Sequence, residues 1–533
     1  MEEAARDLDS LFWEVLEEVC SSHLPRDEGP VTCQCCPQHG VRGLDPGIPG
    51  LANISYQSLT AQLPIKLGGL GLRSQAALIP YAYYGAIEMS LPHFPAGICP
   101  QLAHLYDDDV SEDIRWSALL DSNSRTGREL AASMGKAREE VTTLCTYLGE
   151  EELPTLHSGE LEGLGQGKTD GSSRAIMVRE VERLRAAALT KAMADFPDRT
   201  ARPVLVRKNT DKLSFAFLLA KPGPHSGIPA VHFSEQLLAL LAVPSVICRG
   251  RVGERVGQLK VDRWGDNVLN ATLPGGHFTR GHNVMKNTLN NLFRYCGILS
   301  EVEPYGVFAD LIPQQPLNRA QAFRAAQTII PDIRAELPDS TGGGTKRTYL
   351  EVKTVSGLSQ WYLPVREDRA VEKRDKAIKK EYETAAKKAD QRYYNTDSGP
   401  ITQRLVQIGP ILPASFGRLG EAGDPVHKLV SVMAQARVTK QTLAWGRGED
   451  TEKVHLSVET AYLRQRLSSA VVTCFGQRLQ SRMSLVGLGA ITASQRRQQW
   501  SREEERARQC RSADWMAAVT GRDIVRRGRF WTG

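Results

Sequence analysis

Two acidic residues and a lysine are spaced so that they could support phosphodiester hydrolysis. Asp332 follows a proline, and Glu351 and Lys353 come 19 and 21 positions later. Two carboxylates can hold one Mg²⁺ ion, which stabilises charge on a phosphate group. Residues i and i+2 of a strand project from the same face, so a strand would place Lys353 beside Glu351. There the amine could orient or deprotonate a water. The spacing therefore predicts a metal-dependent nuclease site.

The same residues admit a plainer interpretation. The Pro-Asp pair could form a turn, and Glu351 and Lys353 could lie on a solvated strand face. Glu301 or Glu303, on the preceding expected strand, could add a metal ligand or remain a surface glutamate. The nuclease interpretation is favoured because the acid and the acid-x-lysine set fall on consecutive expected strands.

The elements expected around these residues mix helices and strands. Apolar side chains at helical spacing predict a helix over residues 283–297, ended by a glycine. Strands are expected at residues 301–308, 329–335, 348–355 and 405–408, and a charged helix at about 368–394. This order predicts an α/β (α+β) core.

Basic side chains occur near this core and could contact phosphates. His277, Arg280 and His282 surround the expected start of the 283–297 helix, where an anion could bind, although plain capping by Asn283 is equally compatible. Lys379 and Lys380, with a second lysine pair at 387–388, lie on the charged helix. They could meet a nucleic-acid backbone or form a solvated face of mixed charge.

Composition sets limits on the class of protein. The 533 residues are 41% hydrophobic and 24% charged, with a formal net charge of +6. This balance is typical of a globular protein of several domains and is compatible with a polyanionic partner. The N-terminus is acidic and no apolar run approaches about 20 residues, so neither a signal peptide nor a membrane span is expected. We therefore expect a nuclear or cytoplasmic protein with no membrane partner.

Several segments together resemble the C-terminal part of non-LTR (LINE-type) retrotransposon reverse transcriptase polyproteins. Leu-Pro-Ile-Lys-Leu-Gly-Gly-Leu-Gly-Leu at 63–72 is similar to the segment just downstream of the polymerase palm. Gly-His-Phe-Thr-Arg-Gly-His-Asn at 276–283, the acids at 301 and 303, Pro-Asp at 331–332 and the later charged helix are similar in order to the restriction-like endonuclease of these proteins. That domain belongs to the PD-(D/E)XK nuclease superfamily.

The resemblance implies roles for individual residues and four domains. Asp332 and Glu351 would bind Mg²⁺ or Mn²⁺, Lys353 would be the catalytic lysine, and Glu303 would be an auxiliary acid. Tyr382 matches the lysine-tyrosine stretch of the following helix approximately, and DNA or element RNA would be the partner. The expected domains are a palm-proximal helical remnant at 1–110, a helical linker region at 111–230 with a flexible loop at 158–173, the nuclease at 231–425 and a basic helical region at 426–533.

The chain also departs from the family pattern. No polymerase aspartate pair is present, so no polymerase activity is expected from this truncated form. The zinc knuckle keeps Cys248 but has asparagine where the family has histidine, so no zinc is expected there. These losses leave open a catalytically inactive nucleic-acid-binding or structural remnant. A more distant alternative is a nucleotide-binding loop that uses Lys168.

Overall fold

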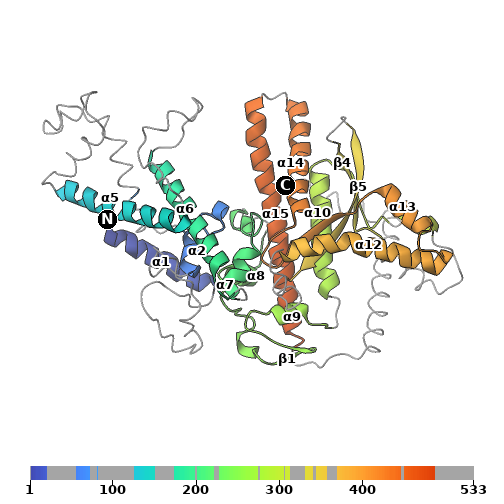
Figure 1. Cartoon of the computed structure of the whole chain (residues 1–533), viewed down its shortest axis with the longest axis horizontal. Helices are drawn as coiled ribbons and strands as arrows, with labels where there is room; N and C mark the ends of the chain where they lie inside the picture. Colours follow the sequence, from blue (N-terminus) through green and yellow to red (C-terminus); the bar gives the residue numbers. More distant parts are fainter. Residues whose placement is uncertain are drawn as a thin grey trace, which may run out of the picture.

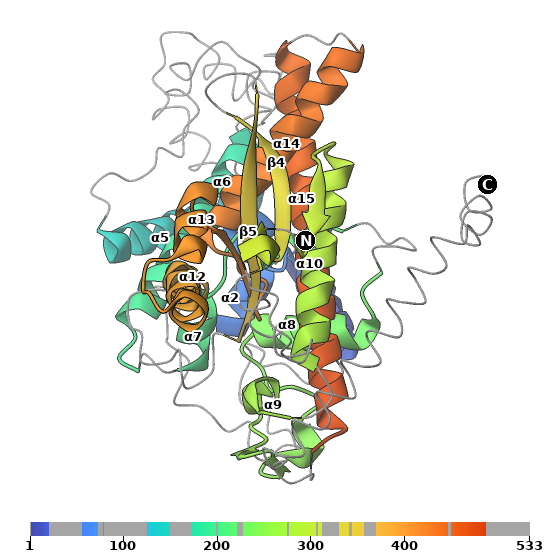
Figure 2. The ribbon, with the colours of Figure 1, turned by 90° about the vertical axis from the view of Figure 1, so that its right-hand side faces the viewer.

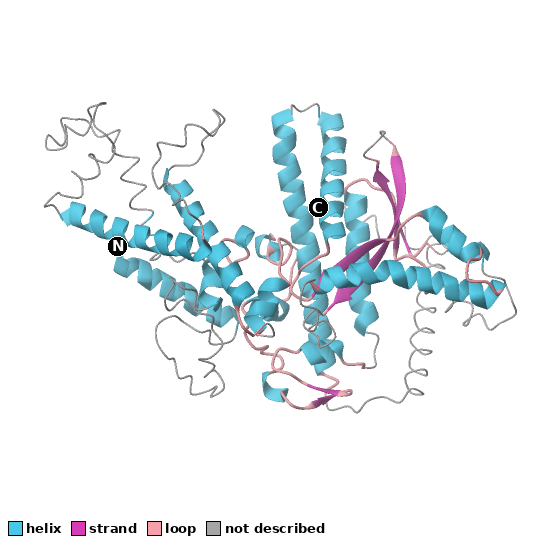
Figure 3. Cartoon of the chain, in the orientation of Figure 1, coloured by secondary structure: helices cyan, strands magenta, loops and turns pink. Residues whose placement is uncertain are grey.

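The computed structural model describes most of the helices and strands of the chain. The described residues are 2–20, 56–72, 78, 81, 125–149, 173–198, 201–220, 227–273, 277–304, 307–311, 330–339, 344–356, 369–445 and 449–486. Figure 3 shows that helices dominate and that the strands gather in one half of the molecule. The chain is thus a mixed α+β protein, as expected.

The larger sheet has the strand order β3-β4-β5-β6. Its strands are β3 (Ser300–Val302), β4 (Ile333–Pro338), β5 (Thr345–Val355) and β6 (Leu412–Gly417). The first three pair antiparallel, whereas β6 runs parallel to β5, with Lys353 opposite Ser415. A parallel pair needs a long crossover, and the chain between β5 and β6 contains the helices α12 (Ala370–Tyr394) and α13 (Pro400–Ile408).

Helices cover both faces of this sheet (Figure 2). On one face, α10 (His277–Tyr295), α14 (Asp424–Trp445) and α15 (Glu449–Met483) share a core with the strands, which includes Leu350 and Val352 at 0% exposure. On the other face, α12 and α13 enclose a smaller core around Tyr349 and Ile378. Alternate residues of β5 therefore face different layers, as the strand period of two requires.

The remaining described helices form a second core, drawn in blue and green in Figure 1. These helices are α1 (Glu2–Cys20), α2 (Tyr56–Gln62), α5 (Arg125–Leu148), α6 (Ser173–Asp195), α7 (Arg202–Lys208) and α8 (Ala230–Leu240). Shorter elements are β1 (Arg255–Val256), β2 (Leu259–Lys260), α9 (Asp266–Asn270) and the 3-10 turns Ile65–Leu67, Ala216–Leu219, Arg249–Arg251 and Ala309–Leu311. No helix in the described part of the chain is long and apolar enough to cross a membrane.

The expected strand at 405–408 is wrong, because these residues end helix α13. Pro400 occupies the first turn, where its missing N–H costs nothing, and Ile401 and Leu405 are buried one helical turn apart. The strand instead begins three residues after Gly409, the C-cap of α13. Four residues are too few to distinguish the two-residue period of a strand from the 3.6-residue period of a helix.

Helix α10 begins six residues earlier than the sequence indicates, at His277. Gly281 does not end the helix but permits a close approach to α15: a Cβ there would lie 2.9 Å from the Cys474 sulfur. The Cys474 thiol also donates to the Gly281 carbonyl at 3.3 Å. His282 is therefore one turn inside a helix and not at its N-terminus, so the helix-terminus phosphate site expected there is not formed by His282.

Candidate active site

Asp332 lies just before β4 and is held by contacts to two other elements. Its backbone N–H donates to the Leu350 carbonyl at 3.0 Å, which pins it beside β5. Its Oδ2 accepts from the Val352 N–H at 2.8 Å, and its Oδ1 accepts from His282 Nε2 on α10, also at 2.8 Å. The carboxylate thus bridges the sheet and α10 in a single orientation.

Glu351 and Lys353 project from β5 toward α12, as the spacing of two predicts. Lys353 Nζ is paired with Glu351 Oε1. Tyr382 of α12 donates its hydroxyl to Glu351 Oε2 at 2.6 Å. Lys353 is 30% exposed, whereas the Glu351 side chain is 11% exposed, so the amine lies nearer to solvent than the carboxylate. Asp332, Glu351 and Lys353, separated in sequence, form one charged cluster.

The two carboxyl groups have opposite pKa shifts. Burial alone would raise the pKa of Asp332, but the hydrogen bond and charge of His282, together with Lys353, hold it below its usual value. Burial, and then the negative charge of Asp332, raise the pKa of Glu351, and Lys353 and Tyr382 offset this only in part. Burial and the nearby Glu351 raise the pKa of Tyr382 well above its usual value, so Tyr382 stays a donor.

This donor set fits a divalent cation bound by few protein ligands. Two adjacent carboxylates repel each other, and a cation between them would relieve that repulsion. Mg²⁺ is typically bound through one or two carboxylates while keeping waters and substrate phosphates as its other ligands. Within the described residues no group of three or more His, Cys, Asp or Glu side chains could enclose a metal. By that chemistry, Asp332 and Glu351 would hold the cation and leave its other positions to water and substrate oxygens.

Glu303 lies next to this cluster but is engaged by a lysine. Its backbone N–H donates to the Asp332 carbonyl at 2.8 Å, and its φ is 50°, an uncommon value for a residue with a side chain. Its carboxylate is 2.5 Å from Lys286 Nζ, and the Lys286 side chain is only 5% exposed. Sequence reasoning missed Lys286, although its position one turn after His282 puts both side chains on one face of α10.

The described contacts of the Asp332 and Glu351 carboxylates involve His282 but not Arg280, Lys379 or Lys380. Arg280 is exposed on α10, and the side chain of His277 is outside the described residues. Lys379 and Lys380 are exposed on α12, whose inner face carries Tyr382. The segment with Lys168 also falls outside the described residues.

Cys248, at which the sequence suggested a degraded zinc knuckle, is fully buried. Its sulfur packs 3.8 Å from the Met483 sulfur, and burial raises the pKa of its thiol to about 11. The Cys248 side chain contributes to the hydrophobic core shared with α15.

Comparisons with known proteins add no assignment to these observations. No protein-family model matches the chain, and no curated protein matches it. The geometry of Asp332, Glu351 and Lys353 therefore carries the functional argument.

Proposed function

We propose that the chain is a metal-dependent endonuclease of the PD-(D/E)XK type that hydrolyses phosphodiester bonds in DNA. The observation that carries the proposal is the contact of Lys353 with Glu351, beside an Asp332 held below its usual pKa. The resemblance of segment order to non-LTR retrotransposon nucleases supports DNA as the substrate.

Each residue of the cluster has a distinct part in this proposal. Asp332 and Glu351 would hold Mg²⁺ or Mn²⁺, which when bound neutralises charge developing on the phosphate. Lys353, the most exposed of the three, would orient the attacking water. His282 and the Val352 N–H keep Asp332 ionised and aimed, and Tyr382 holds the second oxygen of Glu351.

The direct test is cleavage of supercoiled plasmid by the full chain with Mn²⁺ or Mg²⁺. We expect Asp332→Asn and Lys353→Met each to lower nicking by at least about 10²-fold. Lys346→Met is the matched control, because Lys346 lies on the same strand, is exposed and carries the same charge. Nicking that survives in the double variant Asp332→Asn/Lys353→Met would rule out this site.

A second measurement separates metal binding from turnover. Mn²⁺ should raise the melting temperature of the wild-type chain and of Lys346→Met, but not that of Asp332→Asn, because a ligand that binds only the folded state stabilises it. DNA binding without any metal-dependent cleavage would favour the alternative of an inactive nucleic-acid-binding remnant.

A further inference from the structure

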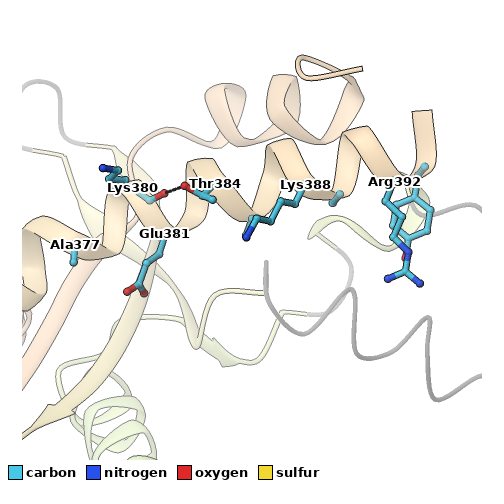
Figure 4. A pocket seen from close by; sticks show the side chains of 9 residues that line it. Ala377, Lys380, Glu381, Thr384, Lys388 and Arg392 are labelled. Atoms are coloured by element: carbon cyan, nitrogen blue, oxygen red, sulfur yellow. Dashed lines mark hydrogen bonds between the residues drawn. The ribbon is translucent and has the colours of Figure 1, made fainter. Parts of the chain in front are cut away.

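A groove of about 600 Å³ runs along one flank of α12 (Figure 4). Its charged lining residues are Lys380, Glu381, Lys388 and Arg392, and small side chains such as Thr384 and Ala385 lie between them. The Thr384 hydroxyl is turned back to the Lys380 carbonyl at 2.7 Å. Small side chains between long basic ones leave space for a bulky ligand to approach the helix.

The groove is positively charged. Glu381 is neutralised by two contacts to Arg374, at 2.6 and 2.8 Å. Lys380, Lys388 and Arg392 have no ion pair with any acid in the described part of the chain. Along the groove, three cations thus have no counter-ion among the residues that the structure describes, and an anionic ligand would complement them.

The spacing of these cations suits a linear polyanion. They lie at positions i, i+8 and i+12 of one helix, which spans about 18 Å at 1.5 Å per residue. The phosphates of one strand of a duplex are spaced about 3.4 Å along its axis, so this length matches about five of them. A single phosphate or a nucleotide would use only part of it.

Helix α12 also connects the groove to the candidate active site. Tyr382, which binds Glu351, lies in the sequence between Lys380 and Thr384. The groove runs along α12 from Ala377 to Arg392 (Figure 4), and Tyr382, the contact of Glu351, falls within this stretch of the helix.

We propose that this flank of α12 binds the sugar-phosphate backbone of a DNA strand that extends from the cleavage site. The proposal rests on the proposed nuclease function for the identity of the ligand. Lysine binds phosphate as a point charge, so the contact is independent of base sequence and weakens as salt increases. The groove selects one lysine from each adjacent pair as a DNA contact, because Lys380 and Lys388 line it and Lys379 and Lys387 do not.

The two flanks of α12 provide matched variants. Lys380→Gln/Lys388→Gln and Lys379→Gln/Lys387→Gln each remove two exposed positive charges from the same helix at the same spacing. Binding of a fluorescent 20-base-pair DNA to the full chain is measured by anisotropy in EDTA at several salt concentrations. We expect Lys380→Gln/Lys388→Gln to weaken DNA binding about tenfold whatever the base sequence. The slope of the logarithm of the binding constant against the logarithm of the salt concentration should fall in magnitude by about 2. Lys379→Gln/Lys387→Gln should change binding less than about twofold.

The proposed DNA contact is overturned if the two double variants lose DNA affinity equally, or if the wild-type chain does not bind DNA. Arg392→Gln is a further variant of the groove. Its DNA affinity should also be lower than that of the wild-type chain, and its melting temperature should be unchanged. If the groove variants weaken DNA binding but the wild-type chain shows no Mn²⁺-dependent cleavage, the proposed DNA contact is supported and the proposed nuclease function is contradicted. Cleavage at wild-type rate and affinity by Lys380→Gln/Lys388→Gln supports the nuclease and contradicts the groove.

Discussion

Two groups of acidic side chains lie near the larger sheet, and they differ in what surrounds them. In the candidate active site, donors from α10, β5 and α12 contact all four carboxyl oxygens of Asp332 and Glu351. In the second group, Asp375 lies two turns before Tyr382 on α12, and Glu421 follows β6. Ser415 is the one side chain that lowers the pKa of Asp375 by hydrogen bonding, and Oε2 of Glu421 has no hydrogen-bond partner among the described residues.

The two groups differ in the neighbours that oppose the effect of burial on the carboxyl pKa. Burial raises the pKa of Glu421 to about 8 and that of Asp375 to about 6. Glu421 is 1% exposed, so its protonated form fills space in the interior. Asp332 is also largely buried, but His282 and Lys353 keep its pKa low. Burial alone therefore does not prepare a carboxylate for a cation; cationic neighbours and access are also needed.

Close packing accompanies the second group. A Cβ at Gly417 would lie 1.8 Å from Glu421 Oε1, and one at Gly423 would lie 1.8 Å from Asp375 Oδ2. The backbone thus lies directly against both carboxyl groups, which leaves no space for a substrate. This arrangement indicates a structural role at the end of β6.

Glu351→Gln should have the largest effect, because it removes a proposed metal ligand but keeps the shape of the side chain. We expect plasmid cleavage to fall about 10³-fold, since the metal supplies several kcal/mol of charge stabilisation and about 1.4 kcal/mol corresponds to tenfold in rate. Nicking rates with Mn²⁺ measure this, and Glu421→Gln is the control in the second group. Equal loss of cleavage in both variants would erase the distinction between the two groups.

Glu421→Gln should instead change stability, and only at higher pH. In the unfolded chain this side chain loses its proton near pH 4.3, whereas in the folded chain it keeps it to about pH 8. Wild-type stability therefore falls as pH rises between these values, and the glutamine variant escapes that loss. We expect it to be more stable than wild type by a few kcal/mol at pH 8. Urea unfolding at pH 8 and pH 5 tests this, and a gain that is the same at both pH values contradicts it.

Tyr382→Phe tests whether the donor to Glu351 is needed. Loss of the hydroxyl leaves a buried carboxyl oxygen unpaired and raises the pKa of Glu351 further, because the Tyr382 hydrogen bond lowers it. We expect cleavage at pH 7 to fall by about 10- to 100-fold, with partial recovery at pH 9. Tyr394→Phe, at the exposed end of the same helix, is the control. A pH-independent loss would indicate a purely structural role for Tyr382.

Glu303→Gln should have the smallest effect on cleavage. The Glu303 carboxylate is paired with Lys286 and is not a proposed ligand of the metal. We therefore expect the cleavage rate to change less than about threefold. Stability should fall by roughly 2 kcal/mol, because the buried Lys286 ammonium loses its counter-charge. Nicking assays and urea unfolding measure the two quantities. A loss of cleavage comparable with that of Glu351→Gln would make Glu303 a third metal ligand.

Local patterns predicted the elements that carry the candidate site but not their limits. The strands at 333–338 and 345–355 and the helix at 370–394 were expected, because alternating or periodic apolar residues determine which face is buried. The 405–408 segment was misassigned, since its burial depends on α12 and the 3-10 turn near Val307. The early start of α10 was missed because Gly281 reads as a helix breaker unless Cys474, almost 200 residues later, is known to pack on it.

The sequence by itself determined that Glu351 and Lys353 project from one face of a strand, since residues two apart do so. It also indicated Asp332, through its place before a neighbouring strand. Only the tertiary structure decided the partners that set the charge of these groups: His282, Lys286 and Tyr382 come from helices that pack on opposite faces of the sheet. It likewise distinguished Lys380 from Lys379, adjacent in sequence but on different flanks of α12. A carboxylate's pKa depends on desolvation and on charges a few ångströms away, and chain folding alone sets both.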